Sequence, residues 1–206
     1  PIGEFALRRA CMDAASWPRS MSVAVNLSAV QFKRNGLVAV VENALAASGL
    51  PGERLELEVT ESLLIDNRDE ALAILLQLKQ LGVRVAMDDF GTGYSSLSYL
   101  QSFNFDKIKI DRAFVADMED NPQEAGIVRA VTWMGKSLNM QVVAEGVETD
   151  AQARLLQKLN CDELEGFLIA KPMAAEDVGQ FIAAQPSATE SPATEMAAAE
   201  VSSDIV

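Results

Sequence analysis

The sequence predicts an α/β fold, a TIM-type (β/α)8 barrel that is incomplete in this chain, with six of the eight strands expected. Short β-rich runs alternate with amphipathic helical segments, which favours parallel pairing because each helix supplies the crossover between neighbouring strands. The strand cores begin near residues 23, 55, 83, 107, 141 and 164. This repeat is close to the ~31 residues per unit of an eight-unit barrel.

The β-rich runs are short, and most of them place polar residues after apolar ones. They are "SVAVNLS" from Ser22, "RLELEVTES" from Arg54, "VRVAMDDF" from Val83, "KIKIDRAF" from Lys107, "MQVVAEGVE" from Met140 and "ELEGFLIAKP" from Glu163.

The segments between these runs have helical periodicity. In residues 68–82 an apolar face formed by Ala71, Ile74, Leu75 and Leu78 is followed by Gly82, where a helix C-cap belongs. In residues 121–139 Pro122 fits the first helical position, and the predicted apolar stripe is Ile127, Val131, Met134 and Leu138. Farther along, Thr149 and Gln152 form a capping box before another apolar face.

Composition narrows the possible functions. The chain has 206 residues, 49% of them hydrophobic, which suits one globular domain with a sizeable core. It contains no histidine, so the usual general base and the commonest zinc ligand are absent. Its two cysteines, Cys11 and Cys161, form no metal-binding pair and are expected to be reduced and buried. A net charge of −13 disfavours binding to DNA, RNA or an anionic membrane.

The two ends of the chain differ in character. The chain starts at Pro1 without a methionine and runs directly into helix-like sequence, so we expect its true N-terminus to lie upstream. No run reaches the ~18 apolar residues of a membrane span, and no signal-peptide pattern is present. Residues 186–206 lack Lys and Arg and predict a disordered acidic tail after a domain at 1–185.

Polar groups stand at or near the C-terminal end of nearly every predicted strand. In a barrel these ends meet at one mouth, where active sites form, whereas the alternative, an open doubly wound sheet, would spread them along a line. A single acid there is more often a helix cap or a solvated charge, but six strands together favour a shared site. The residues are Asn26, Glu58, Glu61, Asp88, Asp89, Lys109, Asp111, Glu145, Glu148 and Glu165, the last of which begins the sixth strand.

A cluster of acids requires a positive partner. Two carboxylates ~4 Å apart repel by roughly 4 kcal/mol at an effective dielectric constant near 20. Oxygen ligands without sulfur or imidazole select Mg²⁺ or Mn²⁺ over zinc, and a bridging carboxylate favours two ions per site.

Three details of the acidic mouth have more than one interpretation. Asp88 and Asp89 are adjacent, so on an ideal strand they would point to opposite faces, and we expect them where the strand gives way to a loop. Lys109 alternates with two isoleucines and is either an inward site residue or a surface lysine whose charged end reaches solvent. Gly91 and Gly93 predict a turn, with a mobile loop as the second interpretation.

Six motifs in order and register resemble the EAL-domain family of cyclic di-GMP phosphodiesterases. They are "NLS", "ELEVTES", "DDFGTGYSSLSYL", "KIKIDRAFV", "VVAEGVET" and "CDELEGFLIAKP". The resemblance covers residues 1 to about 183. It implies a barrel of eight strands, a bacterial signalling role, and two-metal hydrolysis of cyclic di-GMP to linear pGpG.

The resemblance also implies roles for individual residues. Asn26, Glu58, Asp88, Asp89 and Glu145 match the metal-ligand positions. Lys109 matches the lysine that polarises the attacking water, while Glu61 and Glu148 match supporting acids. The loop of residues 90–97 matches one that links metal binding to dimerisation, which predicts a homodimer; it contains Gly91, Thr92, Gly93, Tyr94, Ser95 and Ser96.

Two departures from the family pattern affect the predicted activity. The Glu-Ala-Leu strand, with its metal-binding glutamate, is expected upstream of Pro1, so we expect this chain alone to be weakly active or inactive. The usual Gln-Gly-Tyr reads Glu165-Gly166-Phe167, which places a carboxylate where the family has an amide near the metals and the water.

Two other functions remain open at this stage. A receptor that binds cyclic di-GMP without cutting it would fit the same motifs. A Mg²⁺-dependent proton-abstracting enzyme of the enolase kind would also use acids at strand ends, although the adjacent pair Asp88 and Asp89 fits it poorly. We expect a cytoplasmic location for the segment and no membrane contact from it.

Overall fold

The computed structural model describes residues 2–18, 21–32, 36–61, 63, 68–91, 100 and 102–184. Contacts divide the chain into two units, residues 1–171 and 172–206. The first unit contains every strand of the described residues, and the second contains α10 (Ala175–Ala184). The expected tail at 186–206 and the loop residues Thr92, Gly93, Tyr94, Ser95 and Ser96 lie outside the described residues.

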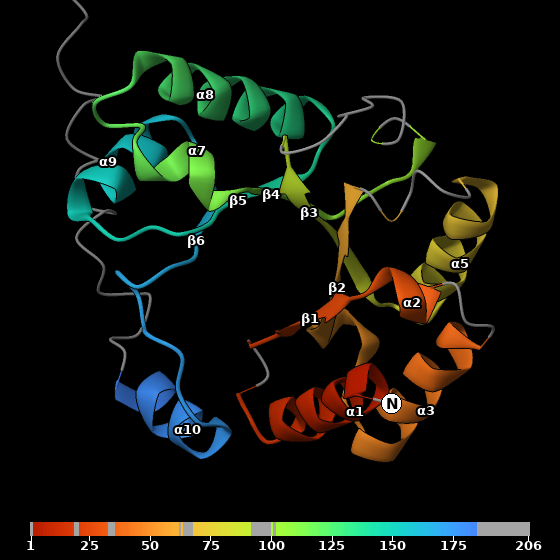
Figure 1. The fold of residues 1–206 in the computed structure, drawn as a ribbon. Helices are drawn as coiled ribbons and strands as arrows, with labels where there is room; N and C mark the ends of the chain where they lie inside the picture. The colour runs from red at the N-terminus through yellow and green to blue at the C-terminus, as the bar shows by residue number, and fades with distance from the viewer. Residues whose placement is uncertain are drawn as a thin grey trace, which may run out of the picture. The chain divides into compact units, whose positions relative to one another are not determined.

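Six parallel strands form one sheet in the order of the sequence. They are β1 (Val23–Leu27), β2 (Leu55–Thr60), β3 (Arg84–Phe90), β4 (Lys107–Ile110), β5 (Gln141–Ala144) and β6 (Glu163–Leu164). The sheet curls with helices along its outer side, as Figure 1 shows. The prediction of an incomplete TIM-type barrel is therefore confirmed.

The helices of the first unit connect the strands. They are α1 (Ile2–Ala15), α2 (Ala29–Phe32), α3 (Leu37–Ser48), α5 (Arg68–Gln80), α7 (Arg112–Ala116), α8 (Pro122–Ser137) and α9 (Asp150–Lys158), with the short 3-10 turn η1 (Gly52–Arg54). The predicted helix signals are confirmed. Gly82 has a φ of 81° just after α5, Pro122 begins α8, and Thr149 and Gln152 form the capping box of α9.

The hydrophobic core lies between the sheet and the helices. Outward strand residues such as Leu57, Met87, Ile108 and Val142 belong to it and are at most 1% exposed. The intervening residues face the inside of the curl and are mostly polar, because side chains alternate along a strand. The inner face of this sheet is thus the place for chemistry, and the outer face supplies the packing.

One predicted helix face is rotated. Ile127, expected in the apolar stripe of α8, is 39% exposed, and the buried residues are Val128, Val131, Thr132 and Gly135. A Cβ on Gly135 would lie 2.7 Å from Val142 Cγ2. The helix therefore approaches the sheet through this glycine, which centres the buried face one residue away from the predicted stripe.

A buried arginine secures the start of the sheet. Arg54 is 7% exposed, and its guanidinium donates hydrogen bonds to the carbonyls of Met21, Ala14, Trp17 and Pro18. These carbonyls lie at the end of α1 and in the segment leading to β1, and two of them, those of Ala14 and Pro18, also accept backbone N–H groups.

Cys11 is buried, Cys161 is half-buried, and both are free thiols. Burial raises the pKa of Cys161 to about 11.

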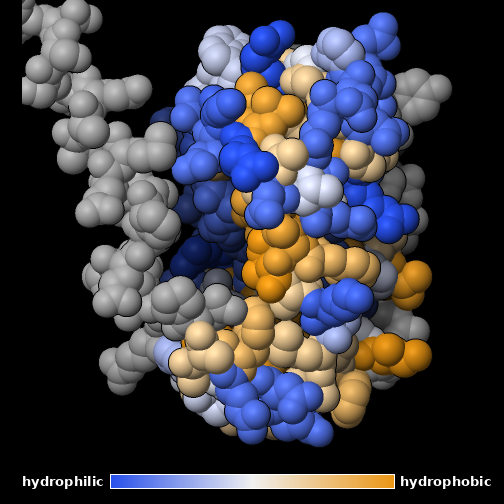
Figure 2. Space-filling view, turned by 90° about the vertical axis from the view of Figure 1, so that its left-hand side faces the viewer, coloured by the Kyte–Doolittle hydropathy of each residue, from blue (hydrophilic) through white to orange (hydrophobic). Residues whose placement is uncertain are grey.

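None of the described helices is long and apolar enough to cross a membrane. In the face drawn in Figure 2, hydrophilic residues in blue flank a band of hydrophobic residues in orange.

Candidate metal centre

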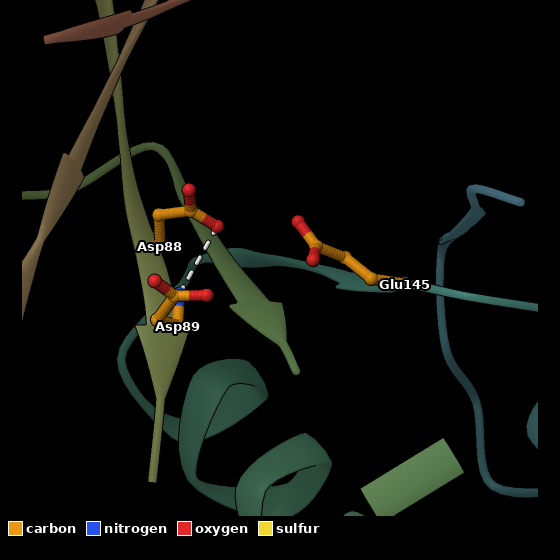
Figure 3. A group of neighbouring side chains, drawn as sticks. All are labelled: Asp88, Asp89 and Glu145. Carbon is orange, nitrogen blue, oxygen red and sulfur yellow. Dashed lines mark hydrogen bonds between the residues drawn. The ribbon is translucent and has the colours of Figure 1, made fainter. Parts of the chain in front are cut away.

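The centre of the site is a group of three carboxylates on two strands. Asp88 and Asp89 come from β3, and Glu145 follows β5 directly. One oxygen from each lies within 4.8 Å of the others, and the three carboxylates point toward a common space in Figure 3. An all-oxygen donor set of this kind fits Mg²⁺ or Mn²⁺.

A β-bulge brings the two adjacent aspartates together. In the β3–β4 ladder Met87 pairs with Ile108 and Phe90 pairs with Ile110, so Asp88 and Asp89 stand opposite one residue of β4. Asp89 has a φ of 53°, and its backbone N–H donates to Asp88 Oδ1 at 3.0 Å. The pair lies one residue before the end of β3 at Phe90, close to where we expected the strand to give way to a loop, and the bulge allows the two adjacent carboxylates to approach one another.

Lys109 lies at the middle of the site. Its Nζ is 2.6 Å from Glu58 Oε1 and 2.5 Å from Glu145 Oε1. Asp88 Oδ1 at 3.6 Å and Glu165 Oε2 at 3.4 Å complete the surroundings of Nζ. Lys109 is 4% exposed, and its side chain lies inside the curl of the sheet. The interpretation of Lys109 as a surface lysine is therefore wrong.

The protonation of these groups follows from burial and pairing. Burial raises the pKa of Glu145 to about 7, although the hydrogen bond from Lys109 opposes the rise. The pKa of Glu58 is also raised by burial, and the pKa of Asp89 is raised by burial and by Asp88. For Lys109 burial alone would lower the pKa, but its bonds to Glu145 and Glu58 raise it, so the side chain is an ammonium.

The formal charge of the mouth is strongly negative. Five carboxylates, those of Glu58, Asp88, Asp89, Glu145 and Glu165, surround one ammonium. Such an excess is costly in a partly buried site unless cations balance it. The residues present therefore fit divalent cations.

Other predicted site residues lie around this centre. Asn26 is exposed on β1 and is the register partner of Glu58. Glu61 follows β2 and is buried at 5% exposure. Gly91 has a φ of 97°, which fits the predicted turn. Asp111 is the N-cap of α7, where its side chain accepts a hydrogen bond from the Ala113 N–H.

Glu148 and Glu165 lie at a cavity beside the acids. The cavity has a volume of about 450 Å³, and its lining includes Arg112, Glu148, Glu165 and Phe167. Glu165 follows β6 rather than beginning the sixth strand, because pairing with β5 ends at Leu164. Glu165 therefore lies at the same end of the sheet as Glu145. The backbone N–H of Glu145 donates to the carbonyl of Ile110, the last residue of β4.

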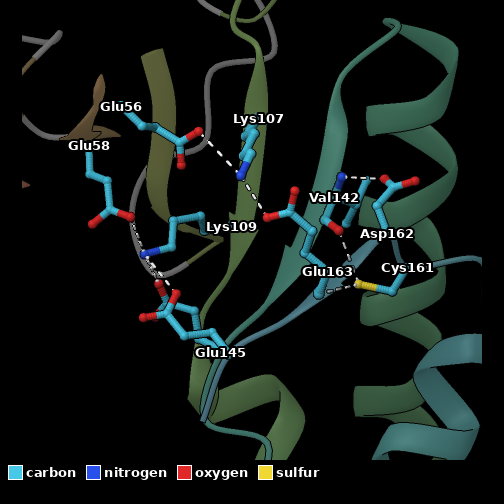
Figure 4. Close-up of polar contacts among 10 residues, drawn as sticks. Glu56, Glu58, Lys107, Lys109, Val142, Glu145, Cys161, Asp162 and Glu163 are labelled. Carbon is cyan, nitrogen blue, oxygen red and sulfur yellow. Dashed lines mark hydrogen bonds and ion pairs between the residues drawn. The ribbon is translucent and has the colours of Figure 1, made fainter. Parts of the chain in front are cut away.

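A second lysine was missed by sequence reasoning. Lys107 Nζ lies 2.6 Å from Glu163 Oε2 and 3.2 Å from Glu56 Oε2, and Figure 4 draws this group above Lys109. The spacing in the sequence indicates this second group. Glu56, Lys107 and Glu163 each precede a predicted site residue by two positions, so each shares the strand face of that residue.

The fold and the site define a class of protein: an α/β barrel with a cluster of carboxylates at the carboxyl ends of its strands that could hold a metal ion. The family profile "EAL domain" matches residues 1–172. The chain belongs to the EAL domain family. The letters Glu-Ala-Leu at residues 70–72 lie in α5 and are not part of a strand.

Individual relatives agree with this assignment. The chain is 45% identical over 181 residues to the bifunctional diguanylate cyclase/cyclic di-GMP phosphodiesterase MucR of Pseudomonas aeruginosa, covering 86% of this chain and 26% of MucR. The solved PaMucR phosphodiesterase in complex with c-di-GMP superposes with a TM-score of 0.83 at 45% identity, covering 86% of this chain and 73% of that one.

A metal-containing structure is also similar. The manganese/cy-diGMP complex of BlrP1 from Klebsiella pneumoniae has a TM-score of 0.78 at 32% identity, covering 84% of this chain and 45% of that one. This chain spans about a quarter of the length of the curated relatives it matches.

Proposed function

We propose that the protein carrying this chain hydrolyses the bacterial second messenger cyclic di-GMP to linear pGpG. The observation that supports this most directly is the convergence of Asp88, Asp89 and Glu145 around a buried ammonium. The EAL domain match and the phosphodiesterase MucR among the relatives support the same substrate.

We propose that Asp88, Asp89 and Glu145, with Asn26 and Glu58 beside them, hold two Mg²⁺ or Mn²⁺ ions. When bound, such ions lower the pKa of a water and stabilise the charge that develops on a phosphoryl oxygen. The carboxylates fix the positions of the ions. The mouth is negatively charged without the ions, so it needs their positive charge to accept an anionic substrate.

The residues of the chain have separate tasks in this proposal. Lys109, as an ammonium, donates a hydrogen bond to the attacking water rather than taking its proton. The water oxygen bonds to phosphorus and the bond from phosphorus to the ribose 3′ oxygen breaks. One proton of the water passes, net, to the released 3′ oxygen, and the product carries a 5′ phosphate and a free 3′ hydroxyl. In the neighbouring cavity Arg112 can bind a phosphate and the exposed Phe167 can stack on a base.

Metal binding and turnover test the proposal separately. Mn²⁺ is added to the 206-residue chain while thermal unfolding is followed, because an ion that binds only the folded state raises Tm. We expect Asp88→Asn and Glu145→Gln to abolish this rise, and Glu42→Gln, a change at an exposed acid of α3, to preserve it. A rise in Tm that survives both site variants would contradict the proposed ligands.

Product analysis distinguishes the possible functions. Formation of pGpG supports the phosphodiesterase, binding of cyclic di-GMP without turnover in Mn²⁺ would indicate a receptor, and an unchanged phosphate skeleton after reaction would indicate proton abstraction. We propose weak turnover for this chain alone, because its described residues form six strands of the expected eight. Rapid Mg²⁺-dependent formation of pGpG by the chain alone would contradict that expectation.

We also propose that the protein is a cytoplasmic homodimer that uses the loop after Asp89. Its support is the resemblance of residues 90–97 to a dimerisation loop, and most of that loop lies outside the described residues. Sedimentation of the chain with and without Mn²⁺ tests the dimer.

A further inference from the structure

The inner face of the sheet carries two parallel rows of charge. Each row consists of a glutamate from β2, a lysine from β4 and a glutamate from β6 or the residue after it. The row nearer the carboxyl ends of the strands, called the upper row, is Glu58, Lys109 and Glu165. The lower row is Glu56, Lys107 and Glu163, and Figure 4 is oriented so that Lys107 is drawn above Lys109. Alternate strands supply each row, which is how side chains layer inside a barrel.

The lower row takes no part in the proposed chemistry, but two of its three side chains are buried. The side chains of Glu56 and Lys107 are 6% and 8% exposed, and that of Glu163 is 43% exposed. Arg84 of β3 is the register partner of Glu56 and also stabilises its charge. Two carboxylates thus face two cations, so this row is balanced, unlike the mouth above it.

The two rows are close enough to exchange partners. Residues two apart on a strand are separated by about 7 Å, and a lysine ammonium moves on a flexible four-carbon stem. Glu56 Oε2 is fully buried, and Lys107 Nζ at 3.2 Å is its ion-pair partner. Without Lys107, Glu56 and Glu163 would attract the ammonium of Lys109, which stands two residues farther along the same strand.

We propose that Lys107 is a positioning residue that keeps the Lys109 ammonium in the upper row. Because Lys107 pairs with Glu56 and Glu163, the ammonium of Lys109 stays paired with Glu58 and Glu145. The consequence for hydrolysis rests on the proposed function, but the placement of Lys109 is a property of the chain without metal.

The side-chain ammonium signals of the metal-free chain test this inference. The ¹⁵Nζ resonance of Lys109 is identified by its disappearance in Lys109→Arg. We expect Lys107→Met to shift this resonance, because the ammonium leaves Glu145 for the lower row, and Lys107→Arg to leave it in place. Lys136→Met serves as the control, since it removes an ion-paired lysine of α8 outside the sheet.

A compensated variant separates charge from packing. Lys107→Met combined with Glu56→Gln and Glu163→Gln removes the attraction but keeps the sizes of the glutamate side chains, so the Lys109 resonance should return to its original position. An unchanged resonance in folded Lys107→Met, or a displaced one in the compensated variant, overturns the inference. Lys107→Met is the decisive variant, and neither result alters the Mn²⁺ test of the proposed function.

Discussion

Asp106 and Asp162 make the same set of contacts at the starts of β4 and β6. Asp106 Oδ2 accepts the Val85 N–H at 2.7 Å, and its other oxygen pairs with Lys79 of α5 at 2.5 Å. Asp162 Oδ2 accepts the Val142 N–H at 2.6 Å, and its other oxygen pairs with Lys136 of α8. Each aspartate thus links a helix, the strand that follows this helix, and the strand that begins just after the aspartate.

These two contacts lie at the end of the sheet opposite the acidic mouth. The backbone reinforces them, because the Asp106 N–H donates to the Val85 carbonyl and the Asp162 N–H donates to the Val142 carbonyl, both at 2.9 Å. In barrels the ends of the strands away from the active site serve stability. Asp106 and Asp162 therefore stabilise the frame on which the site is built.

Removal of either aspartate should destabilise the chain. Asp162→Ala and Asp106→Ala each leave a strand N–H without its acceptor and a lysine without its partner, which costs about 1–3 kcal/mol. Urea denaturation measures the change in the free energy of unfolding. Asp117→Ala, at an exposed aspartate, should change it by no more than about 0.5 kcal/mol. Equal effects of all three changes would contradict the special role of the pair.

The contribution of Asp162 should depend on pH. Burial alone would raise its pKa, but the bonds from Lys136 and the Val142 N–H outweigh burial and lower it. The folded state therefore binds this proton less readily than the unfolded state, so the ion pair stabilises above the ordinary aspartate pKa of about 3.9 and is lost as pH falls below it. The stability difference between the chain and Asp162→Asn should shrink below about pH 4. A difference that stays constant from pH 7 to pH 3 would contradict this expectation.

The sequence predicts the fold well because its signals are local and repeated. Alternation in "KIKI" predicts that Lys109 and the isoleucines face opposite sides, and helix caps such as Thr149 are single-residue signals with a clear backbone consequence. Parallel strands then bring Asp88 and Glu145 to one end of the sheet whatever the details of packing.

The details that the sequence did not predict depend on contacts between distant segments. Gly135 brings α8 close to Val142 and so sets which face of the helix is buried, a fact that periodicity alone cannot give. The bulge at Asp88 and Asp89 depends on register with β4. Lys107 could have been found from its spacing to Lys109, but its partners lie on other strands.

Gly166 should be needed to hold Glu165 at the site. A Cβ at residue 166 would lie 2.3 Å from both the N and the O of Val147, whose N–H donates to the Glu165 carbonyl at 2.9 Å. Gly166→Ala must therefore separate the two loops, and we expect a loss of about 1–3 kcal/mol in the free energy of unfolding.

Gly126→Ala is the matched control for this change. Gly126 lies inside α8, and nothing lies within 4 Å of the position that a Cβ would take. Alanine in a helix is more stable than glycine by about 0.5–1 kcal/mol. The two changes should thus have opposite signs in urea denaturation, and a stabilising Gly166→Ala would show that the loops are not in close contact.

Asp89 should reveal a conflict between stability and metal binding. Its φ of 53° is unfavourable for a residue with a Cβ, and burial, followed by the neighbouring acids, raises the pKa of its carboxyl. Asp89→Gly and Asp89→Ala both remove the carboxylate, but only glycine also relieves the backbone.

We therefore expect metal-free Asp89→Gly to be more stable than Asp89→Ala by about 1 kcal/mol, because alanine at a positive φ is strained. In Mn²⁺ the unchanged chain should gain stability while both variants gain little, since each has lost a proposed ligand. Urea denaturation with and without Mn²⁺ measures both effects. Equal stability of the two metal-free variants would show that the bulge stores no strain at Asp89, and a full gain in Mn²⁺ would remove this residue from the metal centre.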